Sequence, residues 1–198
     1  MLTKHQFLAT LARWRNDAVV ITTMGTVVPW ARFSQTPLDF ASCDSAMGHA
    51  ADFALGIALA QPQRKVICLN GDGSMLMTLG TLVTIVQTGA KNLILCVIEN
   101  STYEVTGNQP IPGAGVVDFT GMAKAAGFPR TYTIDDVATC ERLLPAILSG
   151  EGPVFVTVKV APDEDAPPSR RPDAQAPYLR ISLAESVRQL RRALGSDQ

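Results

Sequence analysis

The stretch that decides the fold is KVICLNGDGSMLMTLGTLVTIVQTGAKNLILCVIENSTYEVTGNQ, residues 65–109. Two short apolar runs, KVICLN at 65–70 and LILCVIE at 93–99, flank a segment of helical length. Such runs predict buried strands, and the stretch between them predicts a buried helix over 74–88. The segment therefore predicts one strand–helix–strand unit of a parallel sheet.

The same alternation continues on both sides of this unit. Three further apolar runs of strand length lie at residues 18–23, 131–134 and 153–160. Strands that alternate with helices form a parallel sheet covered by helices on both faces. The sequence thus predicts an α/β fold, a three-layer doubly wound parallel sheet.

Capping residues mark several of the expected helices. Thr3 and Gln6 match a capping box, which predicts a helix near the start of the chain. Asp118 and Asp135 are predicted N-caps of two later helices. These signals place helices in the connections that the strand pattern requires.

The end of the chain has a different character. Pro and charged residues become frequent over 162–178, which predicts an extended arm, and an amphipathic helix is expected over 183–194. We therefore expect a single domain at residues 1–161, followed by an arm and helix at 162–198. For the arm, the sequence leaves two alternatives: it wraps a neighbouring subunit, or it is disordered.

The composition is that of one soluble globular domain. The 198 residues are 46% apolar and carry 17 basic against 18 acidic side chains, a net charge of -1. The absence of a Lys/Arg run argues against nucleic acid and membrane partners, and residues 73–90, the longest uncharged run, are too polar for a membrane span. With no signal-peptide pattern and no CxxC pair, we expect a cytoplasmic protein with four reduced core thiols, Cys43, Cys68, Cys96 and Cys140.

Charge is unevenly distributed along the chain. Residues 1–130 hold 17 of the 35 charged side chains, and the remaining 68 residues hold 18. A helix without charged residues lacks a solvent face, so the segments 45–60 and 74–88 are expected to pack on both sides. This pattern predicts an obligate oligomer.

The chemistry is expected where the two strands of the central unit end. Asp72 lies in a glycine-flanked turn just after the first strand, and Asn100 follows the second strand 28 residues later. In one strand–helix–strand unit both side chains reach the same edge of the sheet, where α/β proteins bind ligands. A carboxylate, an amide oxygen and a backbone carbonyl such as that of Thr102 are donors suited to Mg²⁺ or Ca²⁺. The predicted ligand is a metal-bound diphosphate.

Other phosphate motifs fit this segment less well. A dinucleotide fingerprint requires a third glycine where Leu76 stands, and the Gly-Lys-Ser/Thr of a P-loop is absent here. An ordinary tight turn explains Gly71-Asp72-Gly73 taken alone. It does not explain the strand before the turn, the helix after it and Asn100 at the required distance.

GDGS at 71–74 followed by ENSTY at 99–103 resembles the cofactor motif of thiamine-diphosphate-dependent enzymes, GDG followed at a distance by Asn-Asn. Glu99 replaces the first Asn of that pair, and Asn100 retains the second. The resemblance extends to MGTVV at 24–28, DSAMGHAADFALGIALA at 44–60 and GNQP at 107–110. The chain is most similar to the diphosphate-binding (PP) part of decarboxylases of the sulfopyruvate and phosphonopyruvate type.

The resemblance implies a thiamine-diphosphate-binding fold and a set of site residues. Mg²⁺ would be held by Asp72, Asn100 and the Thr102 carbonyl, and Met47 would support the bent cofactor. The cofactor-binding residues implied in full are Gly25, Thr26, Met47, Gly48, His49, Gly71, Asp72, Gly73, Ser74, Asn100, Thr102 and Tyr103.

Several of these positions keep an ordinary structural reading as well. Met47 could be a core gap-filler, and Gly25 with Thr26 could form a strand-end turn. His49 could contact the diphosphate or a substrate carboxylate and move protons as a catalytic residue, or could be a structural histidine. For Glu104, downstream of the metal loop, we expect a solvated loop charge.

One residue that the resemblance requires is missing. In the resembling enzymes a glutamate on a pyrimidine-binding (PYR) domain activates the cofactor, yet this chain has no Glu before Glu99. We therefore expect half of an active site, completed by a PYR-type subunit in a hetero-oligomer, α2β2 or larger.

The implied function is that of the PP subunit of a carboxy-lyase acting on a small 2-oxo acid, sulfopyruvate or phosphonopyruvate. Two alternatives share the metal motif. One is a subunit of an acetolactate-synthase-like carboligase, which would form a new C–C bond in place of a free aldehyde. The other is a cofactor-binding module without catalysis, which the intact Asp72 and Asn100 disfavour.

Overall fold

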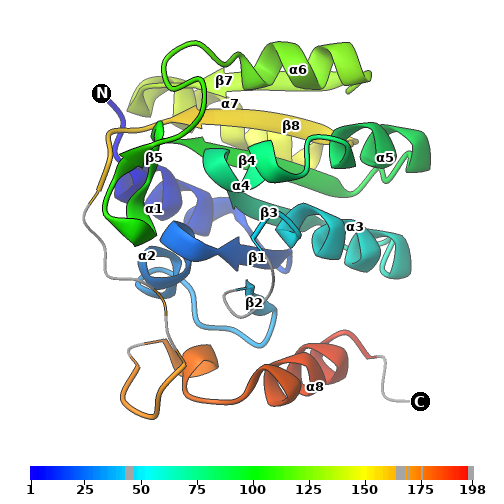
Figure 1. The fold of residues 1–198 in the computed structure, drawn as a ribbon. Helices are drawn as coiled ribbons and strands as arrows, with labels where there is room; N and C mark the ends of the chain where they lie inside the picture. The colour runs from blue at the N-terminus through cyan, green and yellow to red at the C-terminus, as the bar shows by residue number, and fades with distance from the viewer. Residues whose placement is uncertain (43–46, 164–167, 169, 175, 196–198) are drawn as a thin grey trace.

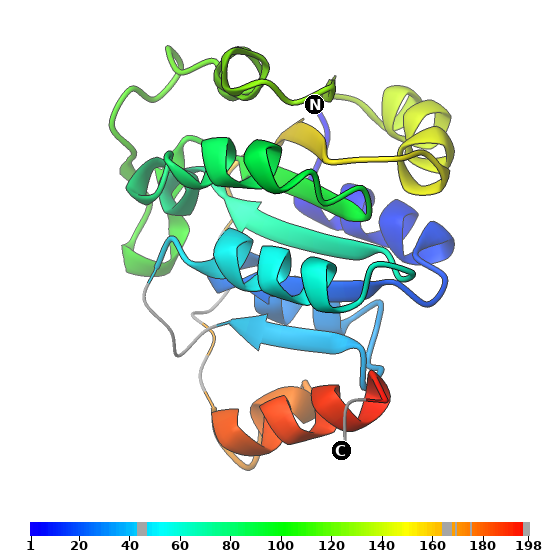
Figure 2. The same ribbon diagram turned by 90° about the vertical axis from the view of Figure 1, so that its right-hand side faces the viewer.

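The computed structural model describes residues 1–42, 47–163, 168, 170–174 and 176–195. Its centre is a six-stranded sheet of parallel strands in the order β2-β1-β3-β4-β8-β7 (Figure 1). The strands are β1 (Val19–Thr23), β2 (Asp39–Ser42), β3 (Val66–Gly71), β4 (Leu93–Glu99), β7 (Arg130–Ile134) and β8 (Val154–Lys159). Helices lie on both faces of the sheet (Figure 2), which confirms the predicted three-layer α/β architecture.

The first helix layer is formed by α1 (Lys4–Trp14), α2 (Val27–Ala31) and α7 (Val137–Ser149). The predicted capping box is present at the start of α1, where the Thr3 side chain accepts the backbone N–H of Gln6 at 3.1 Å. The N-cap of α7 is Asp136 rather than the predicted Asp135, because the Asp136 carboxylate accepts the backbone N–H of Thr139 at 2.9 Å. The apolar sides of α1 and α7 pack together against the sheet.

The second layer is formed by α3 (Ala50–Ala60), α4 (Asp72–Met77), α5 (Thr81–Thr88) and α6 (Phe119–Ala126). Asp118 is the N-cap of α6, as predicted, and accepts the backbone N–H of Gly121 at 2.8 Å. The prediction of one helix over 74–88 is wrong, because the chain breaks into α4 and α5. Thr78 follows the last residue of α4 and has non-helical backbone angles, φ of -139° and ψ of 46°. Its hydroxyl donates to the Gly48 carbonyl at 2.7 Å.

The described part of the arm packs on the domain. It contains a short 3₁₀ turn, η3 (Pro177–Leu179), and ends in α8 (Leu183–Ala193), close to the predicted helix. The Tyr178 hydroxyl donates to the Val27 carbonyl at 3.0 Å, and Leu190 is buried in the core of the second layer. Together η3 and α8 lie beside the edge strand β2 (Figure 1).

Three cysteines, Cys68, Cys96 and Cys140, are free thiols and buried, as expected for core residues. Cys43 lies outside the described residues. Over the part of the chain that the structure describes, no helix combines the length and apolarity needed to cross a bilayer.

The direction of the connections creates a crevice in the sheet. After β1 the chain enters α2 on one face, whereas after β3 it enters α4 on the opposite face. Since β1 and β3 are neighbours, their carboxyl ends form a topological switch point. This is the place where doubly wound sheets bind ligands.

Candidate functional site

A cavity of about 270 Å³ opens at this switch point. Its walls are the turn after β1, the start of α4 and the loop after β4, with Met47 and Lys4 completing them. Ten of the residues predicted from the sequence line it: Gly25, Thr26, Met47, Gly71, Asp72, Gly73, Ser74, Asn100, Thr102 and Tyr103. The predicted residues Gly48 and His49 are not among its lining residues.

Asp72 is the buried acid of the cavity. It follows β3 directly, and its carboxylate accepts three backbone N–H groups, from Gly73 at 2.7 Å, Asn100 at 3.0 Å and Ser101 at 2.7 Å. Burial raises the pKa of Asp72, these hydrogen bonds oppose the rise, and the nearby charge of Glu104 adds to it. A cation beside this carboxylate would offset the cost of its burial.

Asn100 and Thr102 line the same wall. β3 and β4 are paired along their length, so Asn100 emerges next to Asp72. The Asn100 amide oxygen accepts the Thr102 backbone N–H at 2.9 Å, and Ser101 between them adopts a positive φ of 64°. The turn is closed by a short antiparallel pair, β5 (Thr102–Tyr103) and β6 (Gln109–Pro110).

These donors suit a divalent cation that is shared with a ligand. Carboxylate, amide and carbonyl oxygens are the hard donors that Mg²⁺ and Ca²⁺ prefer. Within the described residues, no cluster of three or more His, Cys, Asp and Glu side chains could hold a metal ion by itself. A cation at Asp72 would therefore complete its shell with oxygens of the ligand or water.

Gly73 leaves room for the ring of Tyr103. A Cβ at this position would overlap the Tyr103 ring and lie 3.2 Å from the Ile111 side chain. At Gly73, therefore, α4 presents only backbone to the cavity, and backbone N–H groups at a helix start suit an anion. This arrangement fits a diphosphate.

Ser74 holds the segment that carries Met47. The Ser74 hydroxyl oxygen accepts the backbone N–H of Gly48 at 3.0 Å, and Thr78 bonds the carbonyl of the same glycine. Gly48 has φ of 103°, a conformation that favours glycine. Gly48 thus shapes the turn that presents Met47 to the cavity.

Gly25 and Thr26 form a 3₁₀ turn, η1 (Met24–Thr26), directly after β1. The Thr26 hydroxyl accepts the Thr23 backbone N–H at 3.0 Å and lies 3.1 Å from the Leu69 carbonyl oxygen of β3. These contacts tie the turn to the next strand and place Gly25 in the cavity wall.

His49 lies at the N-cap of α3 and is exposed. Its Nδ1 atom lies 2.8 Å from the carboxylate of Asp52, which also accepts the Thr81 hydroxyl at 2.6 Å. The structure thus pairs His49 with Asp52 outside the cavity lining.

Glu99 stands where the thiamine-diphosphate motif has the first Asn of its Asn-Asn pair. Its carboxylate is mostly buried at the end of β4 and lies 3.9 Å from the ammonium of Lys159 on β8. Burial raises the pKa of Glu99, and the Lys159 charge opposes that rise. A lysine on the neighbouring strand accompanies the acid at this position.

Two charged residues of the cavity differ from expectation. The prediction that Glu104 is a solvated loop charge is wrong, since its side chain is 5% exposed and its carboxylate lies 2.8 Å from the ammonium of Lys4. Lys4 was not predicted at all. Its position in the first turn of a helix, where a cation opposes the helix dipole, is the signal that could have singled it out.

Comparison with known proteins gives relatives with named activities. The chain is 40% identical over 116 residues to the sulfopyruvate decarboxylase subunit beta of Methanothermobacter thermautotrophicus, covering 59% of each chain. It is 34% identical over 117 residues to the phosphonopyruvate decarboxylase of Streptomyces viridochromogenes, covering 59% of this chain and 29% of that protein. The matches thus span less than two thirds of each relative.

A solved structure supports the fold. Benzoylformate decarboxylase from Polynucleobacter necessarius superposes with a TM-score of 0.67 at 21% identity, over 83% of this chain and 34% of that chain. The family model described as thiamine pyrophosphate enzyme, C-terminal TPP binding domain, matches residues 23–158. That match contains the ends of β1, β3 and β4 that build the cavity, and it shows that this chain belongs to the thiamine pyrophosphate enzymes.

Proposed function

We propose that this chain is the cofactor-binding (PP) subunit of a thiamine-diphosphate-dependent decarboxylase of small 2-oxo acids, of the sulfopyruvate or phosphonopyruvate type. The observation that carries the proposal is the juxtaposition of Asp72 and Asn100 in the cavity at the switch point. The names of the two relatives supply the substrate class.

In this proposal Asp72, Asn100 and the Thr102 carbonyl hold Mg²⁺. The diphosphate would be held by the residues that line this cavity beside the cation site, namely Gly25, Thr26, Gly71, Gly73, Ser74 and Tyr103. Met47 would support the bend of the cofactor, and Gly48 shapes the turn before His49. His49 lies outside the cavity lining and would act as a catalytic residue that moves a proton.

When bound, thiamine diphosphate supplies a nucleophilic carbon and a sink for the electron pair of the broken bond. The net reaction cleaves the bond between the keto carbon and the carboxylate of the 2-oxo acid. It consumes one proton and releases CO₂ and an aldehyde. The residues of this chain would bind and orient the cofactor, and they would hold the Mg²⁺ that offsets the diphosphate charge.

A second subunit completes the site in this proposal. The glutamate in the cavity, Glu104, is already engaged by the Lys4 ammonium and by the Asp163 backbone N–H. We therefore assign the activating glutamate to a PYR-type partner in an α2β2 or larger assembly. Exposed apolar side chains on α3, α4 and α5, namely Leu59, Met77 and Val83, suit such a contact.

CO₂ release tests the function. Sulfopyruvate, phosphonopyruvate and pyruvate are each incubated with Mg²⁺ and thiamine diphosphate, using this chain alone and the complex that it retains from its source lysate. We expect CO₂ and free aldehyde from the complex only, with one of the first two acids. Activity of the isolated chain would contradict the divided site. A new C–C bond in the product would indicate the carboligase. No product from either sample would indicate a non-catalytic module.

A further inference from the structure

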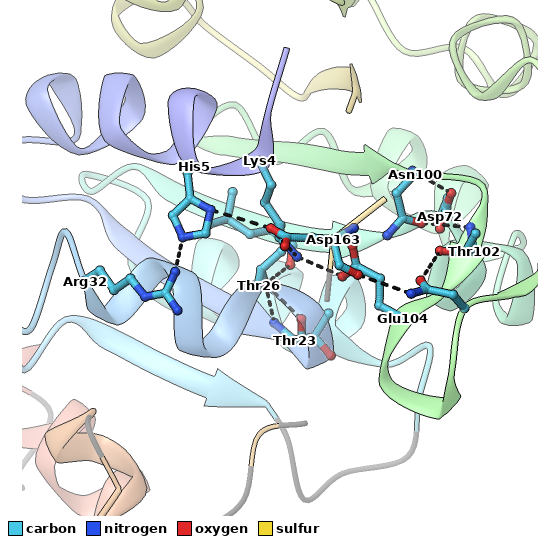
Figure 3. Close-up of polar contacts among 12 residues, drawn as sticks. Lys4, His5, Thr23, Thr26, Arg32, Asp72, Asn100, Thr102, Glu104 and Asp163 are labelled. Carbon is cyan, nitrogen blue, oxygen red and sulfur yellow. Dashed lines mark hydrogen bonds and ion pairs between the residues drawn. The ribbon is translucent and has the colours of Figure 1, made fainter. Parts of the chain in front are cut away.

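An ion pair that joins distant parts of the chain lies in the wall of the cofactor cavity. Lys4, at the start of α1, and Glu104, after β4, are 100 positions apart, and their charged atoms lie 2.8 Å from each other (Figure 3). Their side chains are 1% and 5% exposed, and both residues line the cavity. Burial of two charges is costly, so a pair at this place requires an explanation.

The carboxylate of Glu104 is held on several sides. One oxygen accepts a hydrogen bond from the Lys4 ammonium, and the other accepts one from the Asp163 backbone N–H at 2.9 Å. A Cβ on Gly25 would lie 2.5 Å from the carboxylate, so the absence of a side chain at Gly25 admits it. The side chain of Glu104 therefore ties the loop after β4 to the start of α1 and to the segment that follows β8, and it lies beside the turn after β1.

This contact is directly connected to the proposed cation site. Glu104 begins the 3₁₀ turn η2 (Glu104–Thr106) and follows β5, which contains Thr102 and Tyr103. Thr102 is bonded to Asn100, and the Tyr103 ring fills the space beside Gly73. Fixing Glu104 therefore fixes the segment that supplies one cation ligand and one wall of the diphosphate site.

The charges explain why Lys4 accompanies the acid. Among the described residues that line the cavity, Lys4 is positive, and Asp72 and Glu104 are negative. A cation at Asp72 would compensate that acid, whereas an unpaired carboxylate at Glu104 would repel an anionic diphosphate. Asp163 adds a second acidic group near Lys4, with an oxygen 3.9 Å from the ammonium.

We propose that Lys4 is a positioning residue of the cofactor site, which acts through Glu104. Its ammonium neutralises the Glu104 carboxylate and holds the 102–106 segment in the conformation that receives the cation and the diphosphate. This inference rests on the proposed function, because it gives Lys4 a role in the binding of thiamine diphosphate at this site.

Binding of thiamine diphosphate in saturating Mg²⁺, measured by calorimetry, tests the inference without catalysis. Lys4→Met leaves a buried carboxylate unpaired, so we expect its affinity to fall by about tenfold or more. Glu104→Gln keeps an oxygen that accepts from Lys4 but loses the ion pair, and we expect a smaller fall in affinity than in Lys4→Met. The double variant Lys4→Met/Glu104→Gln removes both members of the ion pair and should recover most of the loss.

The matched control is Lys91→Met, since Lys91 pairs with Glu151 at 3.4 Å on the exposed surface and should bind like the unaltered chain. Circular dichroism checks folding. If Lys4→Met does not fold, Lys4→Gln replaces it, because its amide donates to Glu104 but is uncharged.

Three results separate the claims. Undiminished affinity of the single Lys4 variant would overturn the positioning role. A double variant as weak as the single one would also overturn it, because the loss would then reflect packing. Failure of the unaltered chain to bind thiamine diphosphate with Mg²⁺ would instead contradict the proposed function.

Discussion

The backbone N–H of Asn100 donates to the carboxylate of Asp72 at 3.0 Å, which joins the ends of β3 and β4 across 28 positions of sequence. The two residues are therefore held together by the protein itself. A cation that binds there meets a carboxylate and an amide oxygen whose supporting backbone is already in place. Such preorganisation reduces the entropic cost of binding.

The close approach of Tyr103 to Gly73 predicts that Gly73→Ala is damaging. An added Cβ would lie 2.8 Å from the Cδ1 atom of the ring, so the ring or α4 must shift. We expect a loss of about 1–3 kcal/mol of unfolding free energy in a urea titration. The control is Gly56→Ala on α3, where a Cβ meets nothing within 4 Å and should stabilise the helix slightly. Equal midpoints for the two variants would contradict the predicted crowding at Gly73.

The packing of α8 on the sheet predicts that Leu190 contributes to stability. Leu190 is buried in the core of the second helix layer. We expect Leu190→Ala to cost about 2–5 kcal/mol in thermal or chemical unfolding. Leu59→Ala, at an exposed position on α3, should change the stability of the isolated chain by about 0.5 kcal/mol at most. A Leu190 variant as stable as the Leu59 variant would mean that α8 is not docked.

The buried thiols are predicted to be unreactive in the native protein. Burial raises the pKa of Cys96 to about 12 and of Cys140 to about 11, and it also raises the pKa of Cys68. At pH 8 only about one Cys140 thiol in a thousand is then a thiolate, the reactive form. Iodoacetamide labelling followed by peptide mapping should find these three cysteines modified only in denaturant. Their rapid labelling in buffer would contradict the burial.

Much of the fold is predictable because its strands carry a local signal. The apolar runs that form β1, β3, β4, β7 and β8 are found within one or two residues of their observed bounds. β2 was missed because Asp39–Ser42 is short and contains no β-branched residue. Its Asp39 is buried by tertiary partners, among them the indole N–H of Trp30 at 2.9 Å. Contacts of that kind have no local sequence signature.

The residues of the candidate site likewise include some that the sequence predicts and some that only the folded structure reveals. Asp72 and Asn100 are predictable because a fixed strand–helix–strand spacing places both at one sheet edge. The pairing of Lys4 with Glu104 is not, since only the folded chain brings the two together. The break between α4 and α5 likewise depends on a bond from Thr78 to Gly48, 30 positions away.

The most direct test of the account is titration of thiamine diphosphate into the folded chain with and without Mg²⁺, comparing the unaltered protein with Asp72→Asn. Asp118→Asn serves as the control, because asparagine replaces aspartate at an N-cap with little loss. We predict Mg²⁺-dependent binding to the unaltered chain and to the control, and its loss in Asp72→Asn, where the one anionic cation ligand is gone. Equal Mg²⁺-dependent binding by a folded Asp72→Asn chain would contradict the assignment of the site.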